Sequence, residues 1–313
     1  TAILAFRLIH KYYGLGHLVA RTGYDKAVIR EMVLFSSSMI VPNLAKKWHS
    51  VLPVLFLNFL LPGAKGAEAA GIYGVARKIV STLNVFRESF EYVLAPMTSA
   101  KALVENKAQL REMYAFATRI SIAAFIPTAT YVVFMRDEFL RLSGSEFLQG
   151  SMAIAVLALG RFIEVASGPS SSIIAMIGRY RMPLLNAAGG IVVTAAIAVW
   201  LIPSLGITGG AIAAAAGINV NSLAAHMEVR LFYGLQPYDR SLLRPTLMAV
   251  FISAPLAVIA VSTIPLPRTF HLIIVTSALL VALIAVIRFG YSREDARSIV
   301  PGRLAKRLPF LTS

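Results

Sequence analysis

The chain has 313 residues, of which 57% are hydrophobic and only 14% are charged, and its mean hydropathy is +0.72. Since a soluble domain is about half apolar and a quarter charged, this composition excludes an ordinary soluble protein. The chain has no cysteine, which excludes disulfides and thiolate metal sites, and its five histidines lack any metal-ligand spacing. The sequence also has no glycine-rich phosphate loop and no nucleophile elbow, so we expect no catalytic residue, no metal and no cofactor.

Apolar segments long enough to cross a bilayer follow one another along the chain. A hydrocarbon core about 30 Å thick needs about 20 apolar residues per helix, and lipid offers no hydrogen-bond partner to backbone groups that a helix leaves open. Turn residues such as Pro62, Gly144 and Gly206 separate the segments. The predicted spans are 31–61, 68–97, 114–135, 147–177, 183–203, 207–232, 245–265 and 270–289. The predicted fold class is therefore all-α, a polytopic bundle of these eight transmembrane helices, with residues 1–9 as the tail of a truncated helix before them.

Basic residues lie mainly in alternate loops, which gives the chain an orientation. If residues 1–30 are inside, the loops on that side carry 19 Lys and Arg, whereas the loops on the other side carry four. This bias fits the positive-inside rule with both ends of the chain in the cytoplasm. The net charge of +15 then follows from the topology, and we expect no nucleic-acid partner.

Seven basic residues remain inside the predicted spans, where each charge costs about 2.5–3.5 kcal/mol at the bilayer centre. They are Lys46, Lys47, Arg77, Lys78, Arg87, Arg119 and Arg161. Arg119 lies near the end of its span and can extend to the interface. We expect most of the others to face neighbouring helices or a water-filled cavity.

Two pairs of opposite charge have helical spacing. Arg161 and Glu164 are three residues apart, and Arg87 and Glu91 are four apart, so each pair can meet on one helix face. Two interpretations stay open: neutral pairs that pack helices together, or charged groups that take part in transport. The ion-pair or coupling candidates are Arg87, Glu88, Glu91 and Glu164.

The other basic residues have no acidic partner in their own helix. Adjacent residues point about 100° apart, so one residue of each neighbouring pair can enter a shared space. A cationic cavity of this kind suits a phosphate-bearing substrate. The predicted substrate-binding residues are Arg77, Arg161, Lys46, Lys47 and Lys78. The alternative is that 31–61 consists of two shorter elements broken around Lys46–Trp48, with the lysines near water.

Four stretches of the sequence contain short motifs that resemble those of one known family. They are Gly66–Val75 (GAEAAGIYGV), Ala95–Ser99 (APMTS), Ser167–Asn186 (SGPSSSIIAMIGRYRMPLLN) and Ile202–Ala211 (IPSLGITGGA). In order and spacing they resemble the polysaccharide flippase family of the multidrug/oligosaccharidyl-lipid/polysaccharide (MOP) exporter superfamily. With the spans between them, they cover about residues 31–233.

The resemblance implies a fold of two six-helix lobes around a central cavity, often with two added C-terminal helices. On that plan residues 1–30 are the end of a truncated helix and a cytoplasmic connection, and 31–233 are the second lobe. Residues 234–290 are two additional helices, and 291–313 are a basic cytoplasmic tail. The first lobe is then missing from this sequence. Many relatives have an acidic residue where this chain has the Lys46–His49 segment, which argues against cation coupling through that helix.

The resemblance further implies transport of an undecaprenyl-pyrophosphate-linked oligosaccharide across the bacterial inner membrane by alternating access, for surface polysaccharide or lipopolysaccharide synthesis. The expected partners are this lipid-linked oligosaccharide, membrane lipids and a polysaccharide polymerase machinery. A multidrug exporter of the same superfamily is one alternative, although cationic substrates call for acidic residues. A polysaccharide polymerase or ligase is another, but the longest outer loop, 136–146, holds Asp137 and Glu138 and little else. A third is a scaffold that only packs against a partner.

Overall fold

The computed structural model describes residues 30, 47–85, 87–89, 107–176, 181–261 and 268–291. Apart from residue 30, these lie in one compact unit, Pro42–Ser313. Its described elements are helices and turns without a β-strand, so the predicted all-α class is confirmed. The predicted N-terminal segment 1–29, the end of the span 68–97 and the basic tail after residue 291 lie outside the described residues.

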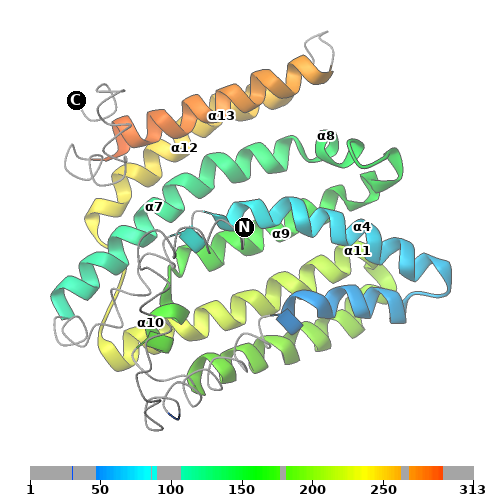
Figure 1. Cartoon of the computed structure of the whole chain (residues 1–313), viewed down its shortest axis with the longest axis horizontal. Helices are drawn as coiled ribbons and strands as arrows, with labels where there is room; N and C mark the ends of the chain where they lie inside the picture. The colour runs from blue at the N-terminus through cyan, green and yellow to red at the C-terminus, as the bar shows by residue number, and fades with distance from the viewer. Residues whose placement is uncertain are drawn as a thin grey trace, which may run out of the picture. The chain divides into compact units, whose positions relative to one another are not determined.

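The helices run side by side (Figure 1). A helix over 47–60 is followed by the long elements α4 (Ala64–Ser81), α7 (Lys107–Phe134), α9 (Ser151–Ala166), α11 (Arg181–Tyr233), α12 (Leu243–Val261) and α13 (Arg268–Gly290). The short elements are η1 (Thr82–Asn84), α8 (Arg136–Arg141), η2 (Ser145–Gly150), α10 (Ser170–Met176) and η3 (Arg240–Leu242). Neighbours in space are not always neighbours in the chain, since α7 packs against α9, α12 and α13 (Figure 1). Within the described residues these helices overlap the predicted spans, although α7 begins at Lys107 rather than at 114, with two exceptions to one element for each span.

The first exception is α11, which contains two helices joined at Gly206. Gly206 has φ 52° and ψ −125°, a conformation outside the helical region that glycine adopts at little cost. Pro203 precedes the bend and lies inside the helix. The predicted spans 183–203 and 207–232 are therefore two helices, as the sequence indicates.

The second exception corrects a prediction, because 147–177 is not one helix. α9 ends at Ala166 and α10 begins at Ser170, with Gly168 between them at φ 63°. Pro169 disfavours the helical conformation of the residue before it, and glycine accepts the left-handed one. The carbonyl oxygens freed at the break are paired: Tyr114 Oη donates to Ser167 O at 2.8 Å, and Tyr238 Oη donates to Ala166 O at 3.0 Å.

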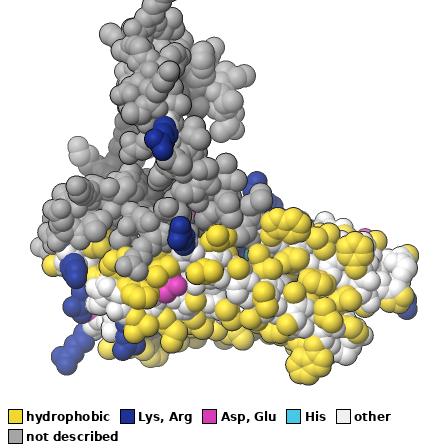
Figure 2. Space-filling view, turned by 90° about the horizontal axis from the view of Figure 1, so that it is seen from below, with side chains coloured by type: hydrophobic (Ala, Val, Ile, Leu, Met, Phe, Trp, Pro, Cys, Tyr) yellow, Lys and Arg dark blue, Asp and Glu magenta, His cyan; other side chains and the backbone are white. Residues whose placement is uncertain are grey.

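Five stretches of the described chain are long and apolar enough to cross a membrane. They are Lys107–Phe134, Ser145–Ala166, Arg181–Tyr233, Arg240–Val261 and Thr269–Gly290, and the third contains two helices. α4 is not among them because its 18 residues include four charged ones. The face shown in Figure 2 is covered mainly by hydrophobic side chains over the described residues, as expected for a surface in contact with lipid.

One core joins the helix over 47–60 to α4, α9 and α11, around the buried side chains of Leu57, Tyr73, Ile154 and Ile202. The two halves of α11 cross with their backbones in close contact, because a Cβ at Gly217 would overlap the Gly190 carbonyl oxygen. Close approach through small residues is the usual way for helices to associate in lipid. α12 and α13 instead pack on α7, through two separate clusters around Ala249 and Leu256.

Candidate functional site

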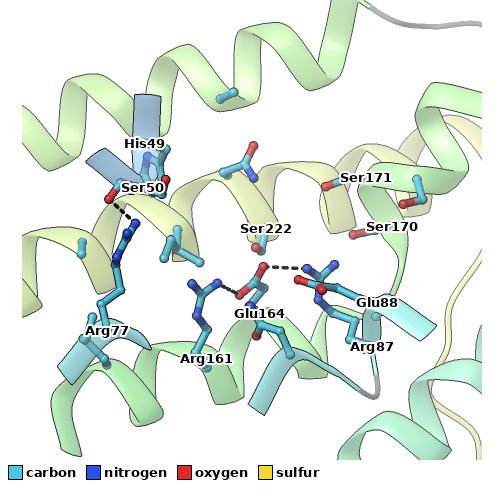
Figure 3. A pocket seen from close by; sticks show the side chains of 18 of the residues that line it. His49, Ser50, Arg77, Arg87, Glu88, Arg161, Glu164, Ser170, Ser171 and Ser222 are labelled. Carbon is cyan, nitrogen blue, oxygen red and sulfur yellow. Dashed lines mark hydrogen bonds and ion pairs between the residues drawn. The ribbon is translucent and has the colours of Figure 1, made fainter. Parts of the chain in front are cut away.

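A cavity of about 550 Å³ lies among the helix over 47–60, α4, α9, α10 and α11 (Figure 3). Its polar lining combines three arginines, two glutamates, a histidine and several small hydroxyl and amide side chains. The charged and histidine residues are Arg77, Arg87, Arg161, Glu88, Glu164 and His49, and the other polar ones include Ser50, Asn84, Ser170, Ser171, Ser172, Asn221 and Ser222. Helices α7, α12 and α13 contribute no residue to the described lining.

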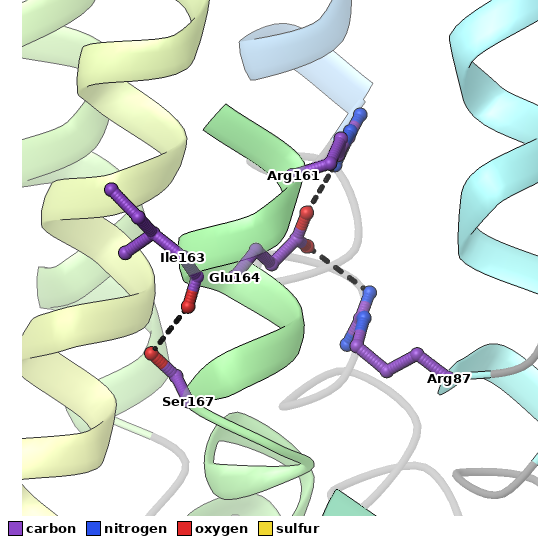
Figure 4. Close-up of polar contacts among 5 residues, drawn as sticks. All are labelled: Arg87, Arg161, Ile163, Glu164 and Ser167. Atoms are coloured by element: carbon purple, nitrogen blue, oxygen red, sulfur yellow. Dashed lines mark hydrogen bonds and ion pairs between the residues drawn. The ribbon is translucent and has the colours of Figure 1, made fainter. Parts of the chain in front are cut away.

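Glu164 holds two arginines at one side of this cavity (Figure 4). Its Oε2 accepts a hydrogen bond from Arg161 Nη1 at 2.5 Å, and its Oε1 lies 3.1 Å from Arg87 Nη2. All three side chains are largely buried, with 13–18% of their surface exposed. The pairing of Arg161 with Glu164 is the one that their spacing on α9 predicts.

Arg87 shows what spacing along one helix cannot reveal. We predicted Glu91 as its partner, but Glu91 lies outside the described residues, and Arg87 pairs with Glu164 on α9. Two helices distant in sequence are thus joined by an ion pair. Only the three-dimensional arrangement brings these two residues together.

Arg77 reaches the cavity from α4. Its Nη1 donates to the backbone carbonyl oxygen of Ser50 at 2.6 Å, which joins α4 to the helix over 47–60. The side chain is partly buried, and Tyr73, one turn earlier on the same helix face, is buried beside the cavity. Both Arg77 and Arg161 therefore lie where the sequence placed a substrate site, and their role in binding stays a prediction.

The two predicted lysines that the structure describes, Lys47 and Lys78, do not contribute to this cavity. Lys78 follows Arg77 directly, so its side chain points about 100° away, and it is exposed. Lys47 is exposed as well and is absent from the lining. Lys46 lies outside the described residues, as does the chain before it, which leaves the possible break around Lys46–Trp48 a prediction. Arg119 donates to Ser241 Oγ, away from the cavity, but it lies near the middle of α7 rather than near a helix end as predicted.

Two lining side chains missed by the sequence analysis carry buried polar atoms without a hydrogen-bond partner in the described structure. They are His49, at both ring nitrogens, and Asn84, at Oδ1. Buried polar atoms are normally paired, so such atoms beside a cavity are available to a ligand or to water. Within the described residues, no group of three or more His, Asp and Glu side chains forms a metal site.

The break between α9 and α10 shapes one end of the cavity. Gly168, Ser170, Ser171 and Ser172 line it there, so the break exposes hydroxyl groups to the polar space. His226 Nδ1 lies 3.0 Å from Tyr114 Oη, the group that caps the freed carbonyl of Ser167. The serine run of the motif 167–186 thus belongs to a fixed break in a helix rather than to helix packing alone.

Comparison with known proteins gives a family match over part of the chain. Residues 8–150, just under half of the sequence, match the family model described as polysaccharide biosynthesis protein. Over that part of the chain the match agrees with the predicted resemblance. The match includes two of the four motif stretches, Gly66–Val75 and Ala95–Ser99, whereas the other two lie beyond it. No curated protein matches the sequence.

Among solved structures, the chain is similar to a MOP superfamily transporter from Pyrococcus furiosus, whose description states that the reverse polarity of its binding pocket suggests a different function. The two share 15% sequence identity with a TM-score of 0.47. The similarity covers 89% of this chain and 66% of the transporter, so the chain spans less than two thirds of that transporter's length.

Proposed function

We propose that this chain is part of a membrane transporter that serves polysaccharide biosynthesis. Its substrate is a lipid-linked oligosaccharide of the undecaprenyl-pyrophosphate type, moved across the bacterial inner membrane by alternating access. The observation that carries the proposal is the cavity, in which three arginines from three segments face one polar space between apolar helices. Charged groups inside a membrane protein are costly and usually mark a substrate pathway.

The charge of the lining favours an anionic substrate. Three arginines exceed the two glutamates, and guanidinium groups bind phosphate through parallel hydrogen bonds. A multidrug exporter for cations would be better served by an excess of carboxylates. His49, Asn84 and the serines add neutral hydrogen-bonding groups suited to sugar hydroxyls.

A polymerase or ligase is the less favoured function. Asp137, in the loop at 136–146, is held in a local network: its Oδ1 accepts from Ser151 Oγ at 2.5 Å, and Arg136 donates to the same hydroxyl at 2.7 Å. A carboxylate engaged in this way stabilises the loop between α7 and α9. We therefore place the function in transport rather than in bond formation.

The test is complementation of a bacterial strain that lacks its polysaccharide flippase. We expect the native protein to restore surface polysaccharide and to reduce the lipid-linked oligosaccharide that accumulates inside the cell. A polymerase would instead lengthen a polysaccharide that is already exported, and a multidrug exporter would change resistance to cationic drugs alone. Either of these results would remove the proposed function.

A further inference from the structure

We propose that Arg87 and Arg161 together form a binding site for one phosphate group, at which Glu164 is an internal competitor. The inference rests on the proposed function and adds a specific role for Glu164. In this account the carboxylate holds the two arginines in place, and a substrate phosphate binds by displacing it. Glu164 is therefore part of the mechanism of binding and release as well as of the packing of the helices.

The geometry of the three residues carries the inference. The two guanidinium groups come from different segments, α9 and the helical residues 87–89, yet both converge on one carboxylate. Each takes a different oxygen of Glu164, at 2.5 Å and 3.1 Å. A phosphate oxyanion offers further acceptor oxygens to the same donors and carries more charge than a carboxylate. The two arginines thus meet at a point where an anion is required.

The electrostatics explain why the competitor is needed. Two arginines whose side chains are only 14% and 18% exposed would repel each other and be costly to bury without a counter-charge. Glu164 supplies that charge within the chain. With Glu164 in place, the trio keeps one net positive charge, which favours a phosphate with a charge of about −1.5 to −2.

Displacement of Glu164 from the arginines also explains how the site selects a phosphate and how it later releases it. A neutral molecule or a cation gains nothing by replacing a carboxylate between two arginines, whereas a phosphate does. After transport, the carboxylate can return to the arginines and expel the phosphate. Removing it should therefore tighten binding and slow turnover at the same time.

The experiment measures binding of inorganic pyrophosphate and of farnesyl diphosphate to the native protein in nanodiscs. We expect Glu164→Gln to bind both about tenfold more tightly than wild type, a coupling within the usual range. Adding Arg161→Gln to Glu164→Gln should remove the gain. Glu228→Gln is the matched control, because Glu228 is a half-buried carboxylate on α11 that accepts a hydrogen bond from Asn186 at 2.8 Å and does not line the cavity, and we expect it to change the affinity less than threefold.

Unchanged or weaker binding by a folded Glu164→Gln protein overturns the inference, as does an equal gain in Glu228→Gln. If Glu164→Gln does not fold, Glu164→Asp keeps the charge on a side chain too short to reach both arginines. It should tighten binding by about threefold, and no change would overturn the inference. A larger gain in affinity for farnesyl diphosphate than for pyrophosphate identifies a lipid headgroup as the natural anion. A larger gain for pyrophosphate identifies a free phosphate-containing anion.

Complementation measured in parallel separates this inference from the proposed function. If wild type fails to restore surface polysaccharide while Glu164→Gln still tightens pyrophosphate binding, the proposed function fails and the site stands. If wild type complements and Glu164→Gln leaves the affinity unchanged, the function stands and the inference fails. With both correct, Glu164→Gln binds tightly but restores polysaccharide poorly at normal protein level.

Discussion

The helices around the cavity and the pair α12–α13 differ in where they place charged and apolar side chains. The first group places arginines, glutamates and a histidine around a cavity between helices, whereas α12 and α13 carry their basic residues only near their ends. The outer faces of α12 and α13 expose large apolar side chains such as Phe251, Val258 and Val281. The helices of the first region thus turn polar side chains toward a shared cavity, whereas α12 and α13 expose apolar side chains, as expected for contact with lipid.

The two regions are also joined differently. Around the cavity, ion pairs and a side-chain-to-backbone bond connect separate helices, as in Arg87 with Glu164 and Arg77 with Ser50. α12 and α13 meet α7 through apolar clusters and through single hydroxyl contacts such as Tyr131 with Thr276. Our proposal places the function in the first region, and the contrast then predicts that matched substitutions will have unequal effects.

The largest loss of stability is expected from adding a side chain at the tight crossing between the two halves of α11. A Cβ at Gly217 would overlap Thr194 Oγ1 and the Gly190 carbonyl, so Gly217→Ala should destabilise the protein by about 3 kcal/mol or more. At Gly290, in α13, the nearest atom is Pro245 Cα at 3.2 Å, and Gly290→Ala should cost no more than about 1 kcal/mol. Thermal stability in detergent measures both.

Gly189→Ala is the control for the first substitution, because a Cβ there meets no atom within 4 Å. It should leave stability and protein level unchanged. Equal losses for the alanine at 217 and at 290 would contradict the close packing around the cavity.

The next effect concerns arginines matched between the two regions. Arg161→Gln should reduce transport by about tenfold or more at normal protein level, because it removes one of two guanidinium groups at the anion site. Arg244 only donates to the Phe289 carbonyl oxygen, at 3.1 Å between α12 and α13, so Arg244→Gln should change transport by less than about twofold. Polysaccharide rescue normalised to protein level is the readout. Recovery of transport when Glu164→Gln is added to Arg161→Gln would reduce Arg161 to a packing role.

A smaller effect is expected from keeping the charge of Arg77 while changing its shape. Arg77→Lys preserves the charge but loses the planar fork that binds phosphate, so transport should fall by about threefold to tenfold. The neighbouring Lys78→Ala should have no effect, because Lys78 is exposed and does not line the cavity. A fall with Lys78→Ala and none with Arg77→Lys would reverse the assignment of the two residues.

The smallest effect is expected in the lipid-facing pair. Tyr131 Oη and Thr276 Oγ1 are 2.7 Å apart and join α7 to α13. Hydrogen bonds between membrane helices contribute about 0.6 kcal/mol on average, so Thr276→Val should lower stability by about that amount and leave transport intact. Loss of transport in this variant would connect α13 to the cavity after all.

Much of the fold could be predicted because lipid makes apolar length a direct signal of a helix. The turn at Gly206 was found from its neighbouring Pro203, and the helix positions of α12 and α13 from their apolar runs. The break at 167–169 was not predicted, because most of the segment 147–177 is apolar or small and is typical of one span. Gly168 and Pro169 favour the break, and the long-range bonds from Tyr114 and Tyr238 pair the carbonyl groups that it frees, which sequence spacing does not reveal.

The site was predictable to the extent that charges in apolar segments must find polar surroundings. Arg77 and Arg161 were identified in this way, and both line the cavity. The same argument gave no means to choose between Arg77 and Lys78, since that choice depends on the helix rotation fixed by Tyr73 and its neighbours in the core. The bond from Arg87 to Glu164 depends on two helices meeting in space, which pairs spaced along one helix cannot show.

The most direct test of the central claim uses the native protein reconstituted in liposomes with a short-chain polyprenyl-diphosphate oligosaccharide. Translocation is measured as the fraction of the saccharide that becomes accessible to an impermeant lectin. The account predicts transfer by wild type, loss of most of that transfer in Arg161→Gln, and wild-type transfer in Arg244→Gln. Equal transfer by all three proteins, or none by a folded wild type, would contradict a phosphate-binding cavity as the basis of transport.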